Sequence, residues 1–331
     1  MWDVYLESIP TATVCHHFLW QLVIQRAYGH RPFYLMALRN AQVCGVLPLV
    51  LVKSRLFGRA LTSMPFLDYG GICADDETVA QPLLEHAQRL LPECGANYIE
   101  LRQCVQPPQT GTLRLDKVGM RLNLSSGINA VWQSFPAKVR NQVRKAEKSG
   151  LRADIGGAEL LDAFYPIFAQ NMRDLGSPVH HRAFFACLFA EFGPQARLVL
   201  VRDGHRAVGG LICLLFKDTV TVPWASSLRE YLAKCPNNLL YWEAMQYAHA
   251  QGYRCFDFGR SSVDSGTYHF KRQWGAEPVQ IYWQVVGRDG HESIAFSANS
   301  AKYSLALEMW KRLPVSFATL LGPHLRKYLT N

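Results

Sequence analysis

The stretch Tyr34-Leu-Met-Ala-Leu-Arg-Asn-Ala-Gln-Val-Cys-Gly-Val-Leu-Pro-Leu-Val-Leu-Val-Lys53 contains two apolar segments separated by a polar turn that opens at Arg39-Asn40. A second stretch repeats this order, Leu198-Val-Leu-Val-Arg-Asp-Gly-His-Arg-Ala-Val-Gly-Gly-Leu-Ile-Cys-Leu-Leu-Phe-Lys217, with its turn opened by Arg202-Asp203. Apolar segments joined by a few turn residues are typical of β-hairpins. Each stretch therefore predicts a hairpin.

The sequence that follows each hairpin is also repeated. Residues 83–95 show the 3.6-residue apolar period of a helix and end at a glycine, before a short strand at 97–102. Residues 239–252 do the same before a strand at 253–260. Glycine is a common residue just past the end of a helix. Hairpin, helix and strand in the same order twice indicate a duplicated α/β (α+β mixed-sheet) fold.

A loop-like cluster between the two copies marks a domain boundary. It consists of Asn123, Ser125, Ser126, Gly127 and Asn129. We expect domain one at 1–125, domain two at 126–296 and a helical tail at 297–331. Domain two has further predicted elements: helices at 138–149, 158–175, 182–192 and 266–274, and a strand at 279–286.

Length and composition suit two globular domains. The chain has 331 residues, of which 49% are hydrophobic and 18% charged, enough apolar surface for two cores. The formal net charge of +9 favours acidic partners such as phosphates, nucleic acid or an anionic membrane surface. The same charge is equally consistent with simple solubility.

Nine scattered cysteines without Cys-x-x-Cys spacing indicate neither a zinc site nor a disulfide framework, and they predict reduced thiols. The histidine pairs at 16–17 and 180–181 have no neighbouring ligand residues, so no metal is expected. The N-terminus lacks the features of a signal peptide, and the longest apolar run, 43–52, is too short to cross a membrane. A cytoplasmic location is expected.

Four motifs in domain two resemble the Fem family of aminoacyl-tRNA-dependent transferases, which have two tandem domains of the GNAT acyltransferase fold and build peptidoglycan cross-bridges. They are the basic segment Lys138–Leu151, Trp224-Ala-Ser226 followed by Pro236–Trp242, Phe256-Asp-Phe-Gly-Arg260, and Phe270-Lys271 followed by Trp274–Glu277. Domain one matches more loosely, through its hairpin and Asp68-Tyr69-Gly-Gly71. The resemblance implies two GNAT-like domains, with the tail returning to domain one.

Arg260-Ser261-Ser262 and Leu321-Gly-Pro323 also resemble a Fem-like subgroup associated with exosortase (PEP-CTERM) exopolysaccharide systems. This resemblance implies an amino sugar of an envelope polymer as the acceptor. The sequence departs from some Fem proteins because it lacks their coiled-coil arm. The family's domain-one acceptor residues have only candidates here, namely Lys53, Arg55 and Arg59.

The resemblance assigns the reacting centre to Phe270-Lys271. Acyl transfer to an amine passes through an oxyanion, which needs a positive or N–H donor, and Lys271 is our candidate for it. Asp257 alternates with two phenylalanines along a strand and is expected to orient the acceptor amine, accept its proton, or pair with Arg260. Arg260 and Ser261 follow that strand. Arg260 is expected to hold a phosphate or carboxylate, or to act as a structural cap.

Further binding candidates are spread along the chain. Arg140, Arg144 and Lys148, with Lys145 beside them, share a helical face that suits either phosphates or solvent. Trp224, Trp242 and Trp274 suit either a sugar-binding platform or the core. The resemblance adds Ser226, Asp68 and Tyr69 as binding residues, besides Lys53 and Arg55.

The donor is expected to be aminoacyl-tRNA, as a co-substrate rather than a resident cofactor. Residues 226–239 contain no glycine, which disfavours the usual GNAT cradle for the pyrophosphate of coenzyme A. The alternatives are an N-acyltransferase that uses coenzyme A or an acyl carrier, and a non-catalytic scaffold. Expected partners are a phosphorylated or nucleotide- or lipid-linked sugar, the tRNA acceptor end and, through the basic, apolar tail, the inner membrane face.

Overall fold

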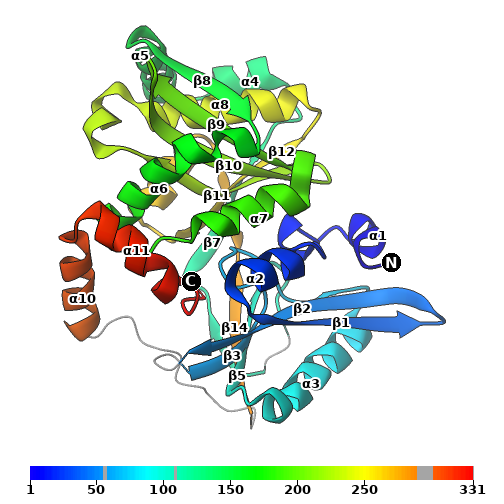
Figure 1. Cartoon of the computed structure of the whole chain (residues 1–331). Helices are drawn as coiled ribbons and strands as arrows, with labels where there is room; N and C mark the ends of the chain where they lie inside the picture. The colour runs from blue at the N-terminus through cyan, green and yellow to red at the C-terminus, as the bar shows by residue number, and fades with distance from the viewer. Residues whose placement is uncertain (55–57, 108–109, 289–300, 331) are drawn as a thin grey trace. The chain divides into compact units, whose positions relative to one another are not determined.

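The computed structural model describes residues 1–54, 58–107, 110–288 and 301–330. The chain divides into two compact units. Unit 1 comprises residues 1–118, 280–300 and 324–331, and unit 2 comprises residues 119–279 and 301–323. Each unit is built around its own mixed sheet, with helices on the faces of the sheet (Figure 1).

The elements of unit 1 include a sheet with the strand order β1-β2-β3-β5-β14-β6, in which β4 also pairs with β2. They are α1 (Trp2–Ser8), η1 (Val14–His16), α2 (Trp20–Tyr28), β1 (Arg31–Arg39), β2 (Gln42–Ser54), β3 (Gly58–Thr62), β4 (Cys73–Ala74), α3 (Glu77–Cys94), β5 (Tyr98–Gln103), β6 (Thr112–Arg114) and β14 (Tyr282–Gly287).

The elements of unit 2, of which β7, β13 and α11 each extend slightly into unit 1, include a sheet with the order β13-β7-β12-β11-β10-β9-β8. They are β7 (Lys117–Asn123), α4 (Ile128–Ser134), α5 (Ala137–Lys148), β8 (Leu151–Gly156), η2 (Ala158–Leu160), α6 (Leu161–Leu175), α7 (Arg182–Phe192), η3 (Gly193–Gln195), β9 (Ala196–Asp203), β10 (Arg206–Phe216), β11 (Thr219–Ser227), η4 (Arg229–Lys234), α8 (Pro236–Ala250), β12 (Cys255–Ser262), α9 (Gly266–Arg272), β13 (Glu277–Gln280), α10 (Ala301–Lys311) and α11 (Val315–Arg326).

Both predicted hairpins are present, as β1–β2 and β9–β10. At the first turn Asn40 and Ala41 have φ of 52° and 63°, which are the positive values that a two-residue hairpin turn requires. The duplication is also confirmed. In each unit two antiparallel pairs precede a parallel pair, which is β3–β5 in unit 1 and β11–β12 in unit 2. A long helix, α3 or α8, lies between the two parallel strands in the sequence.

The strands nearest the domain boundaries differ from the expectation. β7, expected in domain one, lies in the sheet of unit 2 beside β12. The strand expected at 279–286 is split into β13 and β14, and β14 pairs with β5 in the sheet of unit 1. The edge of a strand can pair with any segment that presents matching N–H and C=O groups. The open edge of β5 therefore pairs with β14 and that of β12 pairs with β7, although these strands are far apart in the sequence.

The tail, expected on domain one, divides between the units. Its part up to residue 323 belongs to unit 2, where Arg173 on α6 donates to the Leu313 carbonyl at 3.1 Å. Its last residues belong to unit 1, where Arg102 donates to the Thr330 carbonyl at 2.7 Å and His30 Nε2 lies 2.6 Å from the Lys327 carbonyl oxygen. Residues 297–300 lie outside the described residues.

Candidate active site

The two parallel strands in the middle of the unit 2 sheet diverge. Register between β11 and β12 extends only from the pair Thr219–Cys255 to the pair Thr221–Asp257. Beyond these pairs β11 continues along β10 as far as Ser227, and β12 runs to Ser262. The carboxyl ends of neighbouring parallel strands are a common place for a ligand in α/β sheets. The divergence is therefore the candidate active site.

In unit 1 the matching divergence is filled by the chain itself. Past the last pair of β3 and β5, the Gly70 N–H donates to the Arg102 carbonyl at 2.9 Å, and the Phe66 N–H donates to the Thr330 carbonyl at 3.1 Å. A Cβ at Gly70 would lie 2.7 Å from the Ser63 carbonyl oxygen, so only glycine permits this close packing. The chain itself therefore occupies this position in unit 1.

Lys271 is buried at the end of β12, although a lysine on a short polar helix would usually be exposed. Only 7% of the residue is exposed. Its Nζ donates to the Gly259 carbonyl at 3.0 Å and to the Arg260 carbonyl at 2.8 Å. α9 brings the lysine there because its N-terminus, capped by the Ser265 hydroxyl at 3.2 Å from the Tyr268 nitrogen, begins soon after β12 ends. The ammonium thus supplies donors to carbonyls of β12 that lie beyond its pairing with β11.

Asp257 is 1% exposed, and both of its carboxylate oxygens accept hydrogen bonds. Oδ2 accepts from Arg121 Nε on β7 at 3.1 Å, and Oδ1 accepts from the Gly259 N–H at 2.8 Å. Gly259 has a φ of 76°, which is unusual within a strand. The Asp257 carboxylate therefore holds the backbone at the glycine whose carbonyl Lys271 also contacts. This arrangement favours a positioning role over that of a base. Arg121, which pairs with Asp257 here, is a residue that the sequence analysis missed.

Ser261 lies on β12 next to the carbonyls that bind Lys271. It is 3% exposed, and in the part of the chain that the structure describes its Oγ has no hydrogen-bond partner. Buried hydroxyls are nearly always bonded, because an unsatisfied one costs about 1–3 kcal/mol. A ligand in the divergence between the strands would supply the missing partner. The adjacent Arg260 is half-buried.

Aromatic side chains form one wall of this region. The Phe270 ring lies 5.5 Å from that of Tyr241 and 6.4 Å from that of Trp274, between centroids. Burial raises the pKa of Tyr241. Trp274 is fully buried, and Trp224 packs against Phe184 at 5.6 Å on the α7 side of the sheet.

Trp242 is also buried, 4.5 Å from Trp132 between ring centroids. All three tryptophans are thus buried, which favours the core alternative over a sugar-binding platform. Ser226 is buried too, and its Oγ accepts from Asn171 Nδ2 at 3.0 Å.

The N-terminus of α8 follows β11, where a GNAT domain would bind a pyrophosphate. Pro236 begins the helix without an N–H, and the Asn238 N–H already donates to the Cys235 carbonyl at 3.1 Å. The Ser227 hydroxyl donates to Asn237 Oδ1 at 2.6 Å. Groups that would bind an anion are thus used within the protein.

The basic face of α5 lies away from β12 in the sheet order, because α5 packs on α8 and on β8, and β9, β10 and β11 separate β8 from β12. Arg140 donates to the Gln133 carbonyl at 2.9 Å, and the Arg144 guanidinium lies 5.6 Å from the Trp132 ring. Lys145 is exposed.

Lys148 and Arg152 line a cavity of about 510 Å³ together with Glu147 and Glu243. Burial, and then the charge of Glu147, raise the pKa of Glu243. The C-terminal end of α5 therefore has both acidic and basic neighbours, and its side chains do not form a uniformly basic face.

The domain-one candidates lie in unit 1. Tyr69 is buried and Asp68 half-buried, both in the segment that fills the divergence of β3 and β5. Lys53 is exposed on β2, directly opposite the exposed Arg59 of β3. Arg55 lies outside the described residues.

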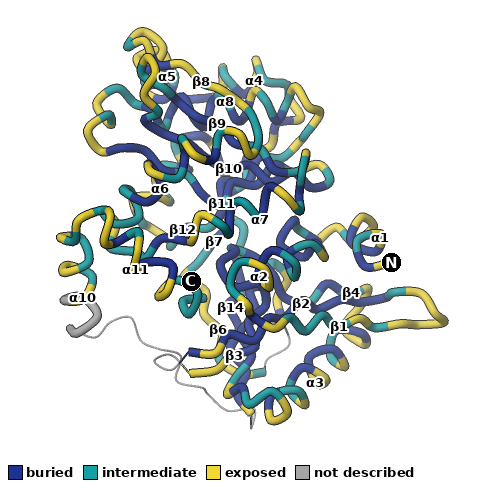
Figure 2. Tube along the Cα trace, viewed as in Figure 1, coloured by how far each residue is buried: buried dark blue, intermediate teal, exposed yellow. Residues whose placement is uncertain are grey.

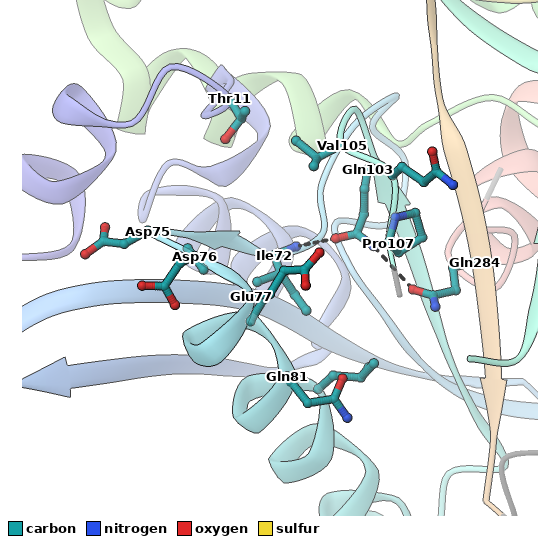
Figure 3. Close-up of a pocket in the computed structure, with 14 residues that line it drawn as sticks. Thr11, Ile72, Asp75, Asp76, Glu77, Gln81, Gln103, Val105, Pro107 and Gln284 are labelled. Carbon is teal, nitrogen blue, oxygen red and sulfur yellow. Dashed lines mark hydrogen bonds between the residues drawn. The ribbon is translucent and has the colours of Figure 1, made fainter. Parts of the chain in front are cut away.

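Unit 1 also contains a pocket of about 260 Å³ that the sequence did not reveal (Figure 3). Carboxylates at the start of α3 (Asp75, Asp76 and Glu77) and four glutamines line it, and no Lys, Arg or His is among the lining residues. At its base Gln103 accepts from the Ile72 N–H at 3.2 Å and donates to Gln284 Oε1 at 3.3 Å. Such a lining suits a neutral polar or cationic group. It was missed because β14 joins this sheet from far along the chain.

Two other kinds of functional feature are absent from the part of the chain that the structure describes. Among the described residues, no group of three or more His, Cys, Asp or Glu is arranged to hold a metal ion. None of the helices in the described ranges combines the length and the apolar character needed to cross a bilayer.

Comparison with known proteins supports the geometry of unit 2. Residues 133–272 match the family described as "Acetyltransferase (GNAT) domain". This segment contains β8 to α9, and hence the divergent strands and Lys271. No relative was found by sequence among curated proteins. The domain match assigns acyl transfer as the reaction class, so the protein is an acyltransferase.

Solved structures show the same tandem arrangement. The crystal structure of FemX has a TM-score of 0.70 at 14% identity, over 87% of this chain and 96% of FemX. L-PGS from Bacillus licheniformis has a TM-score of 0.57 at 10% identity, over 94% of this chain and 96% of that one. A tandem GNAT protein from the clavulanic acid biosynthesis pathway has a TM-score of 0.54 at 12% identity, over 86% of this chain and 94% of that protein. The chain thus has a Fem-like tandem GNAT fold.

Proposed function

We propose that this protein transfers an aminoacyl group from aminoacyl-tRNA to an amine of a cell-envelope precursor or of an amino sugar in an envelope polysaccharide. The observation that carries the proposal is the divergence of β11 and β12, with the buried Lys271 ammonium and the unbonded Ser261 hydroxyl at its β12 side. The domain match and the resemblance to FemX in fold support acyl transfer here.

In the proposed reaction the acceptor nitrogen attacks the ester carbonyl of the donor. A C–N bond forms, and the carbonyl oxygen becomes an oxyanion that the positive charge of Lys271 stabilises. The bond from the carbonyl carbon to the ribose oxygen then breaks. A phosphate of the substrate takes one proton from the nitrogen and passes it to the ribose oxygen, which leaves as a hydroxyl. Asp257 and Arg121 hold the strand that positions Lys271.

The groups around α8 support the choice of aminoacyl-tRNA as the donor. Because the Asn238 N–H and the Ser227 hydroxyl are bonded within the protein, the pyrophosphate of coenzyme A has few donors there. Exposed Arg144 and Lys145 on α5 offer cations to the phosphates of tRNA. An acyl-CoA-dependent reaction is the second candidate, which the family's description as an acetyltransferase favours.

The donor experiment tests both candidates. The full-length protein is incubated with labelled aminoacyl-tRNA, acyl-CoA or acyl carrier protein and a phosphorylated amino sugar, and labelled amide is measured. We expect amide from aminoacyl-tRNA alone. Transfer from acyl-CoA or the carrier alone would contradict the tRNA proposal and support the alternative. Failure with every donor and a range of amines would instead favour a non-catalytic scaffold.

A phosphorylated or nucleotide- or lipid-linked acceptor fits the pair Lys53 and Arg59. The two residues are directly opposite each other on antiparallel strands, where like charges repel unless an anion lies between them. Lys53→Gln is expected to raise KM for a phosphorylated acceptor roughly fivefold, through loss of about 1 kcal/mol of attraction, and to leave kcat unchanged. An unphosphorylated acceptor is the control. Equal KM changes for both acceptors would contradict phosphate recognition at this pair.

Ser261→Ala separates a binding role from a structural one. The hydroxyl has no partner in the described part of the protein, so its removal is expected to leave the free energy of unfolding within about 0.5 kcal/mol or to increase it. Loss of one bond to the substrate should lower kcat/KM roughly tenfold. Both quantities are measured by denaturant unfolding and steady-state kinetics.

Ser226→Ala is the matched control for Ser261→Ala. Its hydroxyl accepts from Asn171, so this variant is expected to lose about 1 kcal/mol of stability. A Ser261→Ala protein that is destabilised as much as Ser226→Ala, with normal kinetics, would contradict a role in substrate binding.

A further inference from the structure

α11 packs on unit 2 with its small side chains. Ala318 is 3% exposed and Gly322 is buried. A Cβ added at Gly322 would lie 2.9 Å from the backbone nitrogen and from a methyl carbon of Val179, so the helix approaches this segment more closely than a larger residue would allow. The face with the smallest residues is therefore turned inward.

The large apolar side chains of α11 point to solvent instead. We call them the α11 stripe, and they are Phe317 (58% exposed), Leu320 (67%), Leu321 (45%) and Leu325 (40%). Their spacing of i, i+3, i+4 and i+8 places them on one side of the helix. Figure 2 shows exposed stretches along this helix beside buried and intermediate ones. A helix of a globular protein normally buries such a stripe, so this one is suited to a partner.

Basic residues flank the stripe. Arg312 precedes α11 and is exposed, and Arg326 and Lys327 lie at its other end. No Asp or Glu occurs from Met309 to the end of the chain. The acid that precedes this segment in the sequence, Glu308, is paired with Lys311 at 2.7 Å. The segment that carries the stripe therefore has a net positive charge.

We propose that the α11 stripe docks on an anionic lipid surface. Apolar side chains on one face with cations at both ends are the pattern of helices that lie in the membrane interface. The stripe itself has no acidic group that would be repelled by anionic headgroups, and its flanking cations are attracted to them. This inference does not depend on the donor or the acceptor of the reaction.

Vesicle flotation of the full-length protein tests the inference. We expect binding to vesicles that contain phosphatidylglycerol in phosphatidylcholine, with much weaker binding to phosphatidylcholine alone. Leu320→Gln/Leu321→Gln is expected to lower the partition coefficient about tenfold or more, because two apolar side chains no longer enter the interface. Arg312→Gln should lower it roughly fivefold, the contribution of one cation near an anionic surface.

The matched control is Leu113→Gln/Leu115→Gln, which removes two exposed leucines of unit 1 (41% and 51% exposed) and should leave binding unchanged. Melting temperatures of all variants show that they are folded. Equal binding to both vesicle types, or no effect of the stripe substitutions, would overturn the inference. Wild-type dimers that dissociate on Leu320→Gln/Leu321→Gln, measured by analytical ultracentrifugation, would also overturn it by assigning the stripe to a second copy of the chain.

Discussion

Lys271→Ala is expected to lower kcat by roughly 10²–10³, the usual loss for one group that stabilises an oxyanion. It is also expected to destabilise unit 2. The Gly259 and Arg260 carbonyls lose donors at 3.0 and 2.8 Å in a region where the lysine is 7% exposed. Two buried acceptors without these donors would cost about 2–4 kcal/mol together. The fully structural alternative predicts the same instability, so stability and turnover must be measured together.

Lys271→Gln distinguishes charge from hydrogen bonding. The amide still offers N–H donors to the strand end but carries no charge, so part of the stability should return while kcat stays low. Lys271→Arg retains the charge but places it differently, and it should restore little activity. Turnover is measured with saturating donor well below each melting temperature. Wild-type kcat in Lys271→Gln would show that the lysine serves only to hold β12.

Arg102→Met is expected to have the largest effect on the stability of unit 1, a loss of about 3–5 kcal/mol. Arg102 is fully buried on β5 and forms an ion pair with Glu100 at 2.6 Å. It also donates to the Leu67 carbonyl at 2.5 Å and to the Thr330 carbonyl at 2.7 Å. Its guanidinium carbon lies 4.5 Å from the Trp283 ring centroid. Removal leaves a buried carboxylate and releases the segments that fill the divergence of β3 and β5.

Urea unfolding with a probe in each unit measures this effect, because two-unit proteins need not unfold in one step. Glu100→Gln/Arg102→Met should regain part of the loss, since no charge is then left unpaired. Arg206→Met is the control. Arg206 pairs with Glu230 on the surface, with 59% of its side chain exposed, and its loss should cost less than about 1 kcal/mol. Similar losses for Arg102→Met and Arg206→Met would contradict the role assigned to Arg102.

The candidate site shows where sequence reasoning reached its limit. Lys271, Arg260 and Ser261 were selected by resemblance. Arg260 and Ser261 lie on β12, and Lys271 on α9 joins them through its hydrogen bonds to the carbonyls of that strand. Arg121 gave no signal of its own, because it lies on a strand 136 residues from Asp257. The burial of Lys271 is a second feature that the sequence does not reveal. A lysine on a short polar helix suggests exposure, and only the position of α9 over β12 shows that it is covered.

The sequence alone determined the local elements of this protein. Apolar periodicity and turn residues specified the hairpins β1–β2 and β9–β10 and the helices α3 and α8, because these signals act between residues a few positions apart. Their repetition predicted the tandem fold. Tertiary structure alone decided which sheet receives β7 and which receives β14, because a strand binds whichever sheet edge is free. It likewise decided that α11 turns its small residues inward, since the close approach to Val179 at Gly322 leaves no room for larger ones.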